Sequence, residues 1–425
     1  MESIGVGVNW AGNHRYAARA LHRPTSVEQL QELVARTAHV RVLGSRHSFN
    51  DIADADEVIS LEALPDDIVI DRDAGTVSFA AGLRYGALVD ALAGAGVALH
   101  NLASLPHISV AGAVATATHG SGVANGNLAT AVAGLELVTS AGELLRMSRG
   151  DRDFDGVVVG LGALGAVTRI ALDVQPAYEV QQRVFEGLRW EALAENFDEI
   201  MGCGYSVSVF TRWLEAVDQV WVKSRLDQPE RTGSALFGAP PAPADRHPIL
   251  GIDAAPATPQ LGRPGPWHDR LPHFRMGFTP SAGEELQSEY LLPRRHAVLA
   301  IEAVRALADR MRPLLLVTEI RTVAADRLWM STSYGEDSVA LHFTWRQQPR
   351  AVAELLVPLE QVLAPFGARP HWGKVFAAEA ASVAPQYERY GEFVGLVGRL
   401  DARGAFRNRW LQRSVLAAAG EPPAA

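Results

Sequence analysis

Residues 20–180 alternate between short apolar stretches and a few amphipathic ones. An amphipathic helix capped by Thr25 or Ser26 is predicted to bury Leu30 and Leu33, and a second helix is predicted over 85–93. Alternating apolar and polar positions predict strands, with two pairs forming hairpins, at 39–43, 67–71, 76–80, 135–139, 143–147 and 165–174. Because hairpins interrupt the strand–helix order, this half predicts an α+β unit rather than a regular βαβ array.

The composition changes between residues 227 and 272, where Pro, Gly and Ala are frequent. A continuous helix or strand is not predicted there. A disordered linker is one interpretation, but Trp267, Leu271 and Phe274 favour a loop that packs against the protein. Beyond it, periodicity predicts a second α+β unit with strands at 284–292, 314–322 and 338–344 and helices at 297–311 and 351–363.

The composition is that of a globular protein, with 425 residues, 48% apolar and 20% charged, which is enough for two domains. A net charge of −9 opposes binding to nucleic acid or to an anionic membrane. Residues 1–12 lack the pattern of a signal peptide, and no stretch has the apolar length to span a bilayer, so a cytoplasmic protein is expected.

Cysteine and histidine usage gives no sign of a metal site. The single cysteine, Cys203, excludes an intrachain disulfide and is interpreted as a buried apolar residue. The 13 histidines are scattered, without an H-E-x-x-H motif or a cysteine pair, so no metal is predicted. Packing roles are expected for His268 and His273.

Two segments predict the wall of a large cofactor site. The predicted strand before Gly44 ends in small and polar residues whose backbone N–H groups suit a pyrophosphate, although a plain turn is the alternative. In the segment 109–122, eleven of fourteen residues are Gly, Ala, Ser or Thr. Such a run lets the backbone approach a planar cofactor closely, and its polar members favour this over a small-residue packing helix.

A third segment, 160–165, matches G-x-G-x-x-G, the fingerprint of dinucleotide-binding sites. That motif follows a strand and opens a helix. Here a helix is predicted before the glycines and a strand after them. A Rossmann-type NAD site is therefore disfavoured.

Together, the segments 44–50, 109–122 and 160–168 resemble the vanillyl-alcohol-oxidase type of FAD fold, also called the PCMH-type fold. More narrowly, the chain resembles the bacterial alditol oxidases, which are xylitol and sorbitol oxidases. The motifs that carry this resemblance extend nearly from end to end, at 9–13, 42–50, 101–109, 319–326, 342–345 and 369–374. Six separated motifs in one order are specific, whereas any one alone is not.

The resemblance implies an α+β fold in three parts. An FAD-binding PCMH-type domain is expected at 1–178, a substrate-binding cap domain at 179–370, and a C-terminal segment that returns to the FAD domain at 371–425. Contacts with FAD are implied for Val42, Leu43, Gly44, Ser45, Arg46, His47, Ser48, Ser109, Val110, Gly112, Ala113, Thr116, Thr118, His119, Gly120, Gly165, Val167 and His371.

The resemblance also assigns to His47 a covalent bond with the 8α-methyl carbon of FAD. The assignment is chemically sensible, because a neutral imidazole nitrogen can add to the quinone-methide tautomer of the flavin. A histidine that hydrogen-bonds to noncovalent FAD is the alternative. The chain departs from the family at Arg46, where glycine is usual; this side chain can pair with a phosphate or alter the approach to attachment.

Around the substrate, the resemblance places Ser104, Glu319, Arg321, His342, Thr344 and Lys374. Each hydroxyl of a polyol both donates and accepts, so acceptors such as Glu319 and donors such as Lys374 suit it. Positions i and i+2 of a strand face the same side, which pairs Glu319 with Arg321 and His342 with Thr344. An exposed ion pair on a strand is the alternative for Glu319 and Arg321, and a solvated lysine for Lys374.

The implied reaction is oxidation of a terminal primary hydroxyl of a polyol, with molecular oxygen as acceptor and hydrogen peroxide as product. Arg321 and Lys374 are expected to stabilise the developing alkoxide, and His342 is the candidate proton acceptor. A monomer is expected. Two rivals stay open: an aldonolactone oxidase or dehydrogenase of the same fold, and a flavin-binding protein without catalysis.

Overall fold

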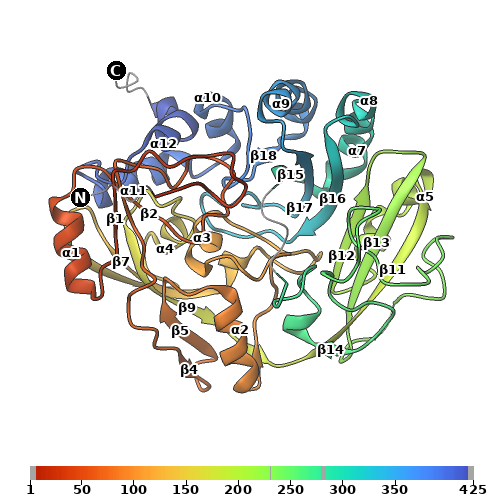
Figure 1. The fold of residues 1–425 in the computed structure, drawn as a ribbon, viewed down its shortest axis with the longest axis horizontal. Helices are drawn as coiled ribbons and strands as arrows, with labels where there is room; N and C mark the ends of the chain where they lie inside the picture. The colour runs from red at the N-terminus through yellow and green to blue at the C-terminus, as the bar shows by residue number, and fades with distance from the viewer. Residues whose placement is uncertain (1–5, 230, 279–283, 420–425) are drawn as a thin grey trace.

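The structure is a computed structural model that describes residues 6–229, 231–278 and 284–419. Figure 1 shows two halves side by side, each built around β-sheets. The first and the last helices of the described chain lie in the same half, and the middle of the chain, coloured green, forms most of the other. The first half contains the segments that the sequence assigns to a cofactor, and the second contains those that it assigns to a substrate.

The first half contains a parallel sheet, an antiparallel sheet and a short strand pair. The parallel sheet has the order β1 (Ala20–His22), β3 (Glu57–Ile59), β2 (Val40–Val42). The antiparallel sheet has the order β4 (Val69–Asp71), β5 (Thr76–Ala80), β9 (Ala166–Asp173), β7 (Val132–Val138), β8 (Leu144–Ser148). The pair joins β6 (Val97–Ala98) to β10 (Gln175–Pro176). Both predicted hairpins, β4–β5 and β7–β8, are confirmed.

Side-chain caps start two of the helical segments of this half, at Ser26 and at Asn127. Ser26 accepts a hydrogen bond from the Gln29 backbone N–H, so it, and not Thr25, is the N-cap of the first helix. That helix buries Leu30 and Leu33 as predicted. The helices of this half are α1 (Val27–Arg36), α2 (Tyr85–Gly94), α3 (Val110–Ala115), the 3-10 turn η1 (Leu128–Ala131) and α4 (Phe154–Val157). The glycines of 160–165 follow α4 and precede β9, which is the reverse of the Rossmann order.

An eight-stranded antiparallel sheet organises the second half. Its strand order is β14 (Gly265–Pro266), β11 (Glu179–Arg189), β13 (Ala216–Arg225), β12 (Ser206–Thr211), β16 (Leu315–Val323), β17 (Ser338–Arg346), β15 (Glu285–Pro293), β18 (Arg369–Pro370). The registers pair Glu319 with His342 and Gln287 with Thr344. Residues of β15, β16 and β17 that are paired in this register therefore lie side by side across the sheet and face the same side.

The two faces of this sheet differ in chemistry. On one face, Ile320, Leu341 and Phe343 pack against the helices in a core cluster. The alternate residues, such as Glu319 and His342, point to the opposite face. The helices of this half are α5 (Trp190–Glu195), α6 (Phe197–Met201), η3 (Arg294–His296), α7 (Ala297–Arg305), α8 (Ala308–Met311), α9 (Pro349–Leu363) and η4 (Ala364–Phe366). The helix predicted over 297–311 is thus two helices, α7 and α8, because the chain departs from α-helical geometry at Ala306 and Leu307.

The proline-rich segment between residues 227 and 272 has little regular structure, as predicted. It contains β14 and the 3-10 turn η2 (Trp267–Asp269). Trp267 is 1% exposed and Leu271 is 4% exposed, and both belong to the core cluster of the first half. The segment therefore packs against the protein and is not a disordered linker.

The C-terminal helices return to the first half (Figure 1). They are α10 (Ala380–Val383), η5 (Ala384–Gln386), α11 (Tyr390–Leu400), α12 (Arg409–Ser414) and η6 (Leu416–Ala419). Phe393 and Trp410 share a core cluster with Leu135 and Val157. The last part of the chain therefore helps to bury the antiparallel sheet of the first half.

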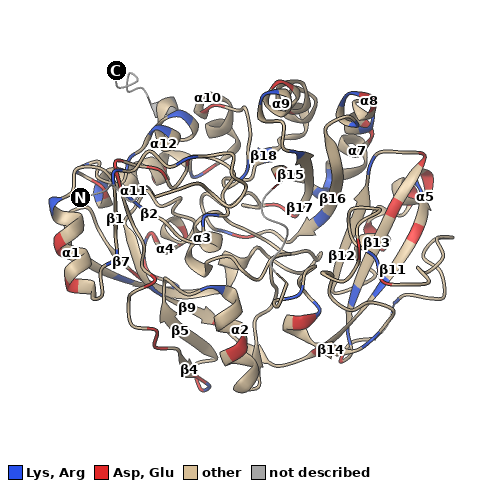
Figure 2. Ribbon diagram, viewed as in Figure 1, with Lys and Arg blue, Asp and Glu red and all other residues tan. Residues whose placement is uncertain are grey.

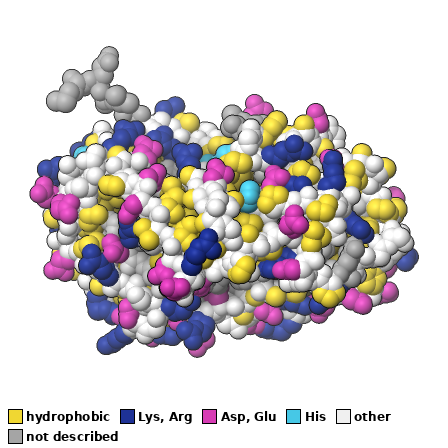
Figure 3. Space-filling model, turned by 90° about the horizontal axis from the view of Figure 1, so that it is seen from below, with side chains coloured by type: hydrophobic (Ala, Val, Ile, Leu, Met, Phe, Trp, Pro, Cys, Tyr) yellow, Lys and Arg dark blue, Asp and Glu magenta, His cyan; other side chains and the backbone are white. Residues whose placement is uncertain are grey.

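Charged side chains of both signs are dispersed over the ribbon (Figure 2). On the face drawn in Figure 3, basic and acidic side chains alternate with apolar ones, and neither sign forms a large patch there. No helix within the described part of the chain combines the length and the apolar content needed to cross a bilayer.

In the first half, Arg41 forms hydrogen bonds with two segments that are distant from it in sequence, at residues 161–162 and at Phe406. Its guanidinium is 2% exposed and donates to the carbonyl oxygens of Leu161 at 2.6 Å, Gly162 at 2.8 Å and Phe406 at 2.9 Å. Burial lowers the pKa of Arg41 to about 10, so the group stays protonated at neutral pH.

Arg41→Met is expected to lower the free energy of unfolding by about 3 kcal/mol or more, because several buried carbonyl groups lose their donor. Urea unfolding followed by tryptophan fluorescence measures this loss. The matched control is Arg350→Met, because Arg350 forms an exposed pair with Glu354 and its loss leaves the unfolding midpoint nearly unchanged. If Arg41→Met lowers the free energy of unfolding no more than this control does, the hydrogen bonds of Arg41 do not stabilise the fold as proposed.

Candidate active site

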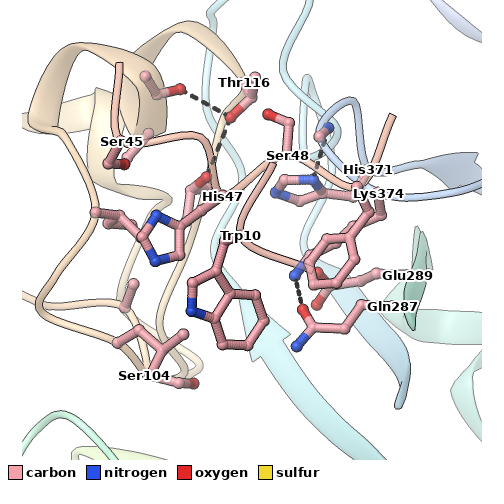
Figure 4. Close-up of a pocket in the computed structure, with 18 of the residues that line it drawn as sticks. Trp10, Ser45, His47, Ser48, Ser104, Thr116, Gln287, Glu289, His371 and Lys374 are labelled. Atoms are coloured by element: carbon pink, nitrogen blue, oxygen red, sulfur yellow. Dashed lines mark hydrogen bonds between the residues drawn. The ribbon is translucent and has the colours of Figure 1, made fainter. Parts of the chain in front are cut away.

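A cavity of about 490 Å³ is lined by residues from both halves of the chain (Figure 4). Predicted cofactor residues at its wall are Val42, Leu43, Gly44, Ser45, Arg46, His47, Ser48, Ser109, Gly112, Ala113, Thr116, Thr118, His119 and His371. Predicted substrate and catalytic residues at its wall are Ser104, Glu319, Arg321, His342, Thr344 and Lys374. The structure therefore brings the two predicted sets together around one space.

Four predicted cofactor residues do not line the cavity: Val110, Gly120, Gly165 and Val167. Val110 is fully buried in the core, on the inner side of α3. Gly120 and Gly165 are small because backbone packs against them: a Cβ on Gly120 would lie 2.5 Å from the Leu102 carbonyl oxygen, and one on Gly165 2.6 Å from that of Val138.

The wall of the first half is built where two small-residue segments meet. The Ser109 backbone N–H donates to Ser45 Oγ at 2.9 Å. A Cβ on Gly44 would lie 2.4 Å from Ser109 Oγ, and one on Gly112 would lie 2.7 Å from the same atom. Glycine at position 44 therefore lets the two segments approach this closely, whereas glycine at position 112 leaves room for the Ser109 hydroxyl within its own segment. The resulting slot lets a ligand lie directly against the backbone.

His47 lies in this wall, next to an aromatic side chain. Trp10 stacks on the imidazole, with ring centroids 5.5 Å apart and planes inclined by 20°. Burial lowers the pKa of His47 to about 4, with smaller contributions from Arg84 and Lys374, so the ring is neutral at physiological pH. Nδ1 is buried and has no hydrogen-bond partner among the described residues. A neutral ring with an unpaired buried nitrogen, beside a glycine slot, fits an FAD that reacts with histidine.

Arg46 lines the cavity, and its guanidinium is held by a backbone carbonyl group. Its guanidinium donates to the Val6 carbonyl oxygen at 2.6 Å. Its backbone has φ of 62°, in the left-handed region that glycine adopts most readily. A glycine, which the family resemblance implies at this position, would adopt this conformation without strain.

The opposite wall is one face of the eight-stranded sheet. Glu319 and Arg321 come from β16 and His342 and Thr344 from β17, so the predicted same-face pairs are both present. Strand β15 adds Glu285, Gln287 and Glu289 at alternate positions of the same face. All of Glu319, Arg321, His342, Thr344 and Glu289 are buried. The alternative of an exposed ion pair for Glu319 and Arg321 is therefore excluded.

Arg321 lies between two carboxylates. Its Nη2 donates to Glu289 Oε1 at 2.6 Å, and its Nε lies 3.6 Å from Glu319 Oε1. Burial alone would raise the pKa of Glu289, but His119, Arg321 and His342 outweigh it and hold that pKa well below its usual range. Burial also opposes ionisation of Glu319, yet Arg321 and His273 keep its pKa low. Both acids are therefore ionised, and their charges raise the pKa of Arg321 against the effect of burial.

Lys374 reaches the same space from the segment after β18. Asn50 Nδ2 donates to the carbonyl oxygens of Trp372 and Lys374, each at 2.8 Å, which fixes this segment to the loop that carries His47. Lys374 Nζ donates to Gln287 Oε1 (Figure 4). Burial lowers the pKa of Lys374 to about 8, although Glu289 opposes this shift. The alternative of a fully solvated lysine is excluded, because the side chain is half-buried and lines the cavity.

His342 is neutral and adjoins a hydroxyl group. Burial lowers its pKa more than the nearby Glu289 raises it. Its Nδ1 lies 3.4 Å from Glu289 Oε2, and its Nε2 lies 3.3 Å from Thr344 Oγ1. With a proton on Nδ1, facing the carboxylate, Nε2 is the basic nitrogen and accepts a hydrogen bond from Thr344 Oγ1.

Sequence reasoning missed several residues of the cavity, including Trp10, Gln287, Glu289 and His273. His273 packs against aromatic rings, as expected, and its Nε2 also lies 2.7 Å from Glu319 Oε1, a contact that the sequence did not predict. The period-two pattern of the predicted strand at 284–292 could have shown that Gln287 and Glu289 share a face. This face adjoins Glu319 because β15 pairs with β17 and β17 pairs with β16. A local sequence pattern does not predict such pairing.

Comparison with known proteins agrees with this arrangement. A family model described as "FAD binding domain" matches residues 18–148, and one described as "D-arabinono-1,4-lactone oxidase" matches residues 283–414. The fold is similar to that of cholesterol oxidase from B. sterolicum, with a TM-score of 0.77, 15% identity and 96% of each chain covered. The fold and the matched domain define the class: an FAD-binding oxidoreductase of the PCMH type, with α+β architecture.

Alignment along nearly the whole chain gives the family. An alditol oxidase from Streptomyces sp. (strain IKD472) is 48% identical, over 95% of this chain and 97% of that protein. L-gulono-1,4-lactone dehydrogenase from Mycobacterium tuberculosis is 30% identical, over 95% of this chain and 98% of that protein. The chain belongs to the alditol oxidase family.

Gly44→Ala is expected to weaken FAD binding about tenfold, because the added methyl group overlaps Ser109 Oγ and pushes the two segments apart. The ratio of flavin to protein absorbance in purified protein measures the loss. Adding Ser109→Ala should restore part of the binding. Gly94→Ala is the control, since nothing lies within 4 Å of a Cβ there. Equal flavin content in Gly44→Ala and this control would refute the slot.

Proposed function

We propose that the protein oxidises the terminal primary hydroxyl of an alditol such as xylitol or sorbitol to the aldose and passes the electrons to oxygen, which yields hydrogen peroxide. The observation that carries the proposal is the buried polar face of β15, β16 and β17, which stands across one cavity from the glycine slot and His47. Its mixture of carboxylates, cations and hydroxyls suits a ligand made of hydroxyl groups. Non-catalytic flavin binding gives no reason for so many buried charges.

FAD, when bound, supplies the hydride acceptor and the path of electrons to oxygen. We propose that 42–48 and 109–118 hold it, together with His371, and that His47 bonds to it covalently. In this scheme 1–178 is the FAD-binding domain, 179–370 is the cap, and 371–425 returns to the first domain. Trp10 holds the imidazole plane, and the low pKa of His47 keeps its nitrogen nucleophilic.

The polar face performs the remaining chemistry. Glu319 accepts a hydrogen bond from a secondary hydroxyl, and Ser104 and Thr344 orient the chain of hydroxyls. Arg321 and Lys374 donate to the oxygen of the reacting hydroxyl and stabilise negative charge as it develops. His342 Nε2 accepts the hydroxyl proton, and Glu289 stabilises the resulting imidazolium through Nδ1.

A second candidate is oxidation of an aldonolactone. It is favoured by the match of residues 283–414 to the lactone oxidase model and by the 30% identical lactone dehydrogenase. A lactone ring offers fewer hydroxyl donors than an open alditol. The carboxylates at the cavity wall therefore favour the alditol.

A panel of substrates separates these functions. Anaerobic xylitol or sorbitol is expected to bleach the flavin, and turnover in air should release peroxide, whereas gulono- and galactonolactone should react at least about tenfold more slowly in kcat/KM. Faster bleaching by the lactones would establish the second candidate. No bleaching by any of the four compounds would favour a non-catalytic flavoprotein.

Acid denaturation tests the covalent bond. Precipitated protein is expected to stay yellow, because the flavin remains attached to His47. The His47→Ala variant is expected to release its flavin into the supernatant. His107→Ala serves as the matched control, since His107 lies near His47 but does not line the cavity. A colourless pellet from the unaltered protein would disprove attachment.

The pH dependence of flavin reduction tests Lys374. Because its pKa is about 8, Lys374 is protonated below that pH, and its contribution is expected to disappear as the pH rises through that value. Lys374→Met should slow reduction by about 100-fold, as loss of one donor to a developing oxyanion does. Lys374→Arg should move the decline to higher pH. Stopped-flow mixing with xylitol measures all three proteins, and wild-type kinetics in Lys374→Met would remove Lys374 from the reaction.

A further inference from the structure

The chain has only two lysines, Lys223 and Lys374, among its 39 basic residues. Both lie in the same buried region, although nothing assigns a role to Lys223. It comes from β13 and is 1% exposed, so its ammonium group is removed from water. A buried charge of this kind is expensive unless specific partners hold it. One of these partners, His273, contacts Glu319 of the candidate substrate site.

Three acceptors converge on Lys223 Nζ. They are the carbonyl oxygen of Leu271, the carbonyl oxygen of Pro272 at 3.1 Å, and His273 Nδ1 at 3.1 Å. An ammonium group has three N–H donors and no lone pair, so this set matches it completely. The planar guanidinium of arginine would not match three acceptors that converge on one point.

His273 connects Lys223 to Glu319 through its two ring nitrogens. Its Nε2 lies 2.7 Å from Glu319 Oε1, and Glu319 is ionised, so Nε2 must carry the proton and donate it. Nδ1 is then an acceptor, which requires Lys223 to donate. The rings of Phe210 and Trp221 pack edge-on against the imidazole, at centroid distances of 5.5 and 5.3 Å, and restrain its rotation.

The two carboxylate oxygens of Glu319 have different partners. Both His273 Nε2 and Arg321 Nε approach Oε1. Oε2 is therefore the oxygen that we assign to a substrate hydroxyl. A carboxylate held by one oxygen presents the other in a fixed direction.

We propose that Lys223 is a positioning residue, which acts through His273 to hold Glu319 as an ionised, oriented acceptor for a hydroxyl group of the substrate. This inference rests on the proposed oxidation of an alditol. Neither Lys223 nor His273 exchanges a proton with the substrate in this scheme. Their task is to fix the state of Glu319.

Electrostatics support the arrangement. The charged groups facing His273 are Lys223 from β13 and Glu319 and Arg321 from β16. Burial and Lys223 lower the pKa of His273 to about 4, although Glu319 opposes them, so the ring is neutral. Burial lowers the pKa of Lys223 to about 7, and Glu319 opposes this shift. Below that pH, Lys223 is mainly an ammonium and His273 is a neutral donor through Nε2.

The first test is independent of catalysis and uses the holoprotein labelled with ¹⁵N-histidine at about pH 6, below the pKa of Lys223. The imidazole signal of His273 is assigned by its absence in His273→Gln. The unaltered protein should show a neutral ring with the proton on Nε2. Lys223→Met removes a cation that helps to hold the pKa of His273 at about 4, so a pH titration of the ring signal should show a higher pKa in this variant. The same His273 pKa in both proteins would overturn the proposal.

The second test measures KM and kcat for xylitol. His273→Phe keeps a ring of similar size but removes both hydrogen bonds, and it should raise KM about tenfold or more with little change in kcat, as loss of a hydrogen bond to a charged group does. Lys223→Met should act in the same direction. His273→Gln can accept from Lys223 and donate to Glu319, so it should recover much of the loss.

His268→Gln is the matched control, because His268 lies on the same loop, packs against Trp267 and does not line the cavity. If His273→Phe lowers the thermal midpoint but keeps the KM of this control, the contacts are only structural and the proposal is wrong. If the unaltered protein oxidises no alditol, the proposed function fails, and the NMR experiment still decides the state of His273.

Discussion

The charge of Arg321 is held away from water at the centre of the polar face, and the other ionisable groups of the cavity depend on it. Two ionised carboxylates, Glu289 and Glu319, lie on either side of it. A buried ion is stable only when partners replace its hydration. Lys223 and Lys374 lie close enough to these acids for their charges to interact. The region therefore holds fixed cations and anions in near balance.

Burial, with a smaller contribution from the lysines and the arginine, makes additional protons on the histidines unfavourable there. The pKa of His273 is lowered to about 4 and that of His371 to about 3, in each case mainly by burial. Neutral histidines can accept or donate according to their neighbours, whereas the charged groups keep one role. A row of substrate hydroxyls thus meets partners whose donor and acceptor directions are already set, as catalysis by preorganised electrostatics requires.

The two walls of the cavity are coupled by short backbone contacts rather than by a long linker. The Phe49 backbone N–H donates to the Gly373 carbonyl oxygen at 2.8 Å, and Asn50 holds the carbonyls on either side of it. The loop of His47 and the segment of Lys374 are therefore fixed to each other, although they are more than 300 residues apart. The C-terminal helices pack against the first half and share a core cluster with Trp372, which lies next to Gly373.

Local patterns predicted what depends on neighbours in sequence. The cap at Ser26, the two hairpins and the shared face of Glu319 and Arg321 all follow from short-range periodicity, and each is present. The family resemblance supplied the cofactor and the polar residues Glu319, Arg321, His342 and Lys374 of the cavity, but fewer than half of all the residues that line it. Neither source placed Glu289 beside Arg321, because that contact depends on the pairing of β15 with β17. Lys223 and His273 were missed because their contact joins a strand to an irregular loop 50 residues away.

The central claim is that the cofactor wall and the polar face enclose one substrate between them. A crystal structure of the protein, grown without oxygen and soaked with xylitol, tests it most directly. Electron density for the alditol should lie between the flavin and the side chains of Glu319, Arg321 and Lys374, with a terminal carbon nearest the flavin. Density for xylitol on the far side of the eight-stranded sheet, or a flavin outside the slot at Gly44 and Ser109, would contradict the account.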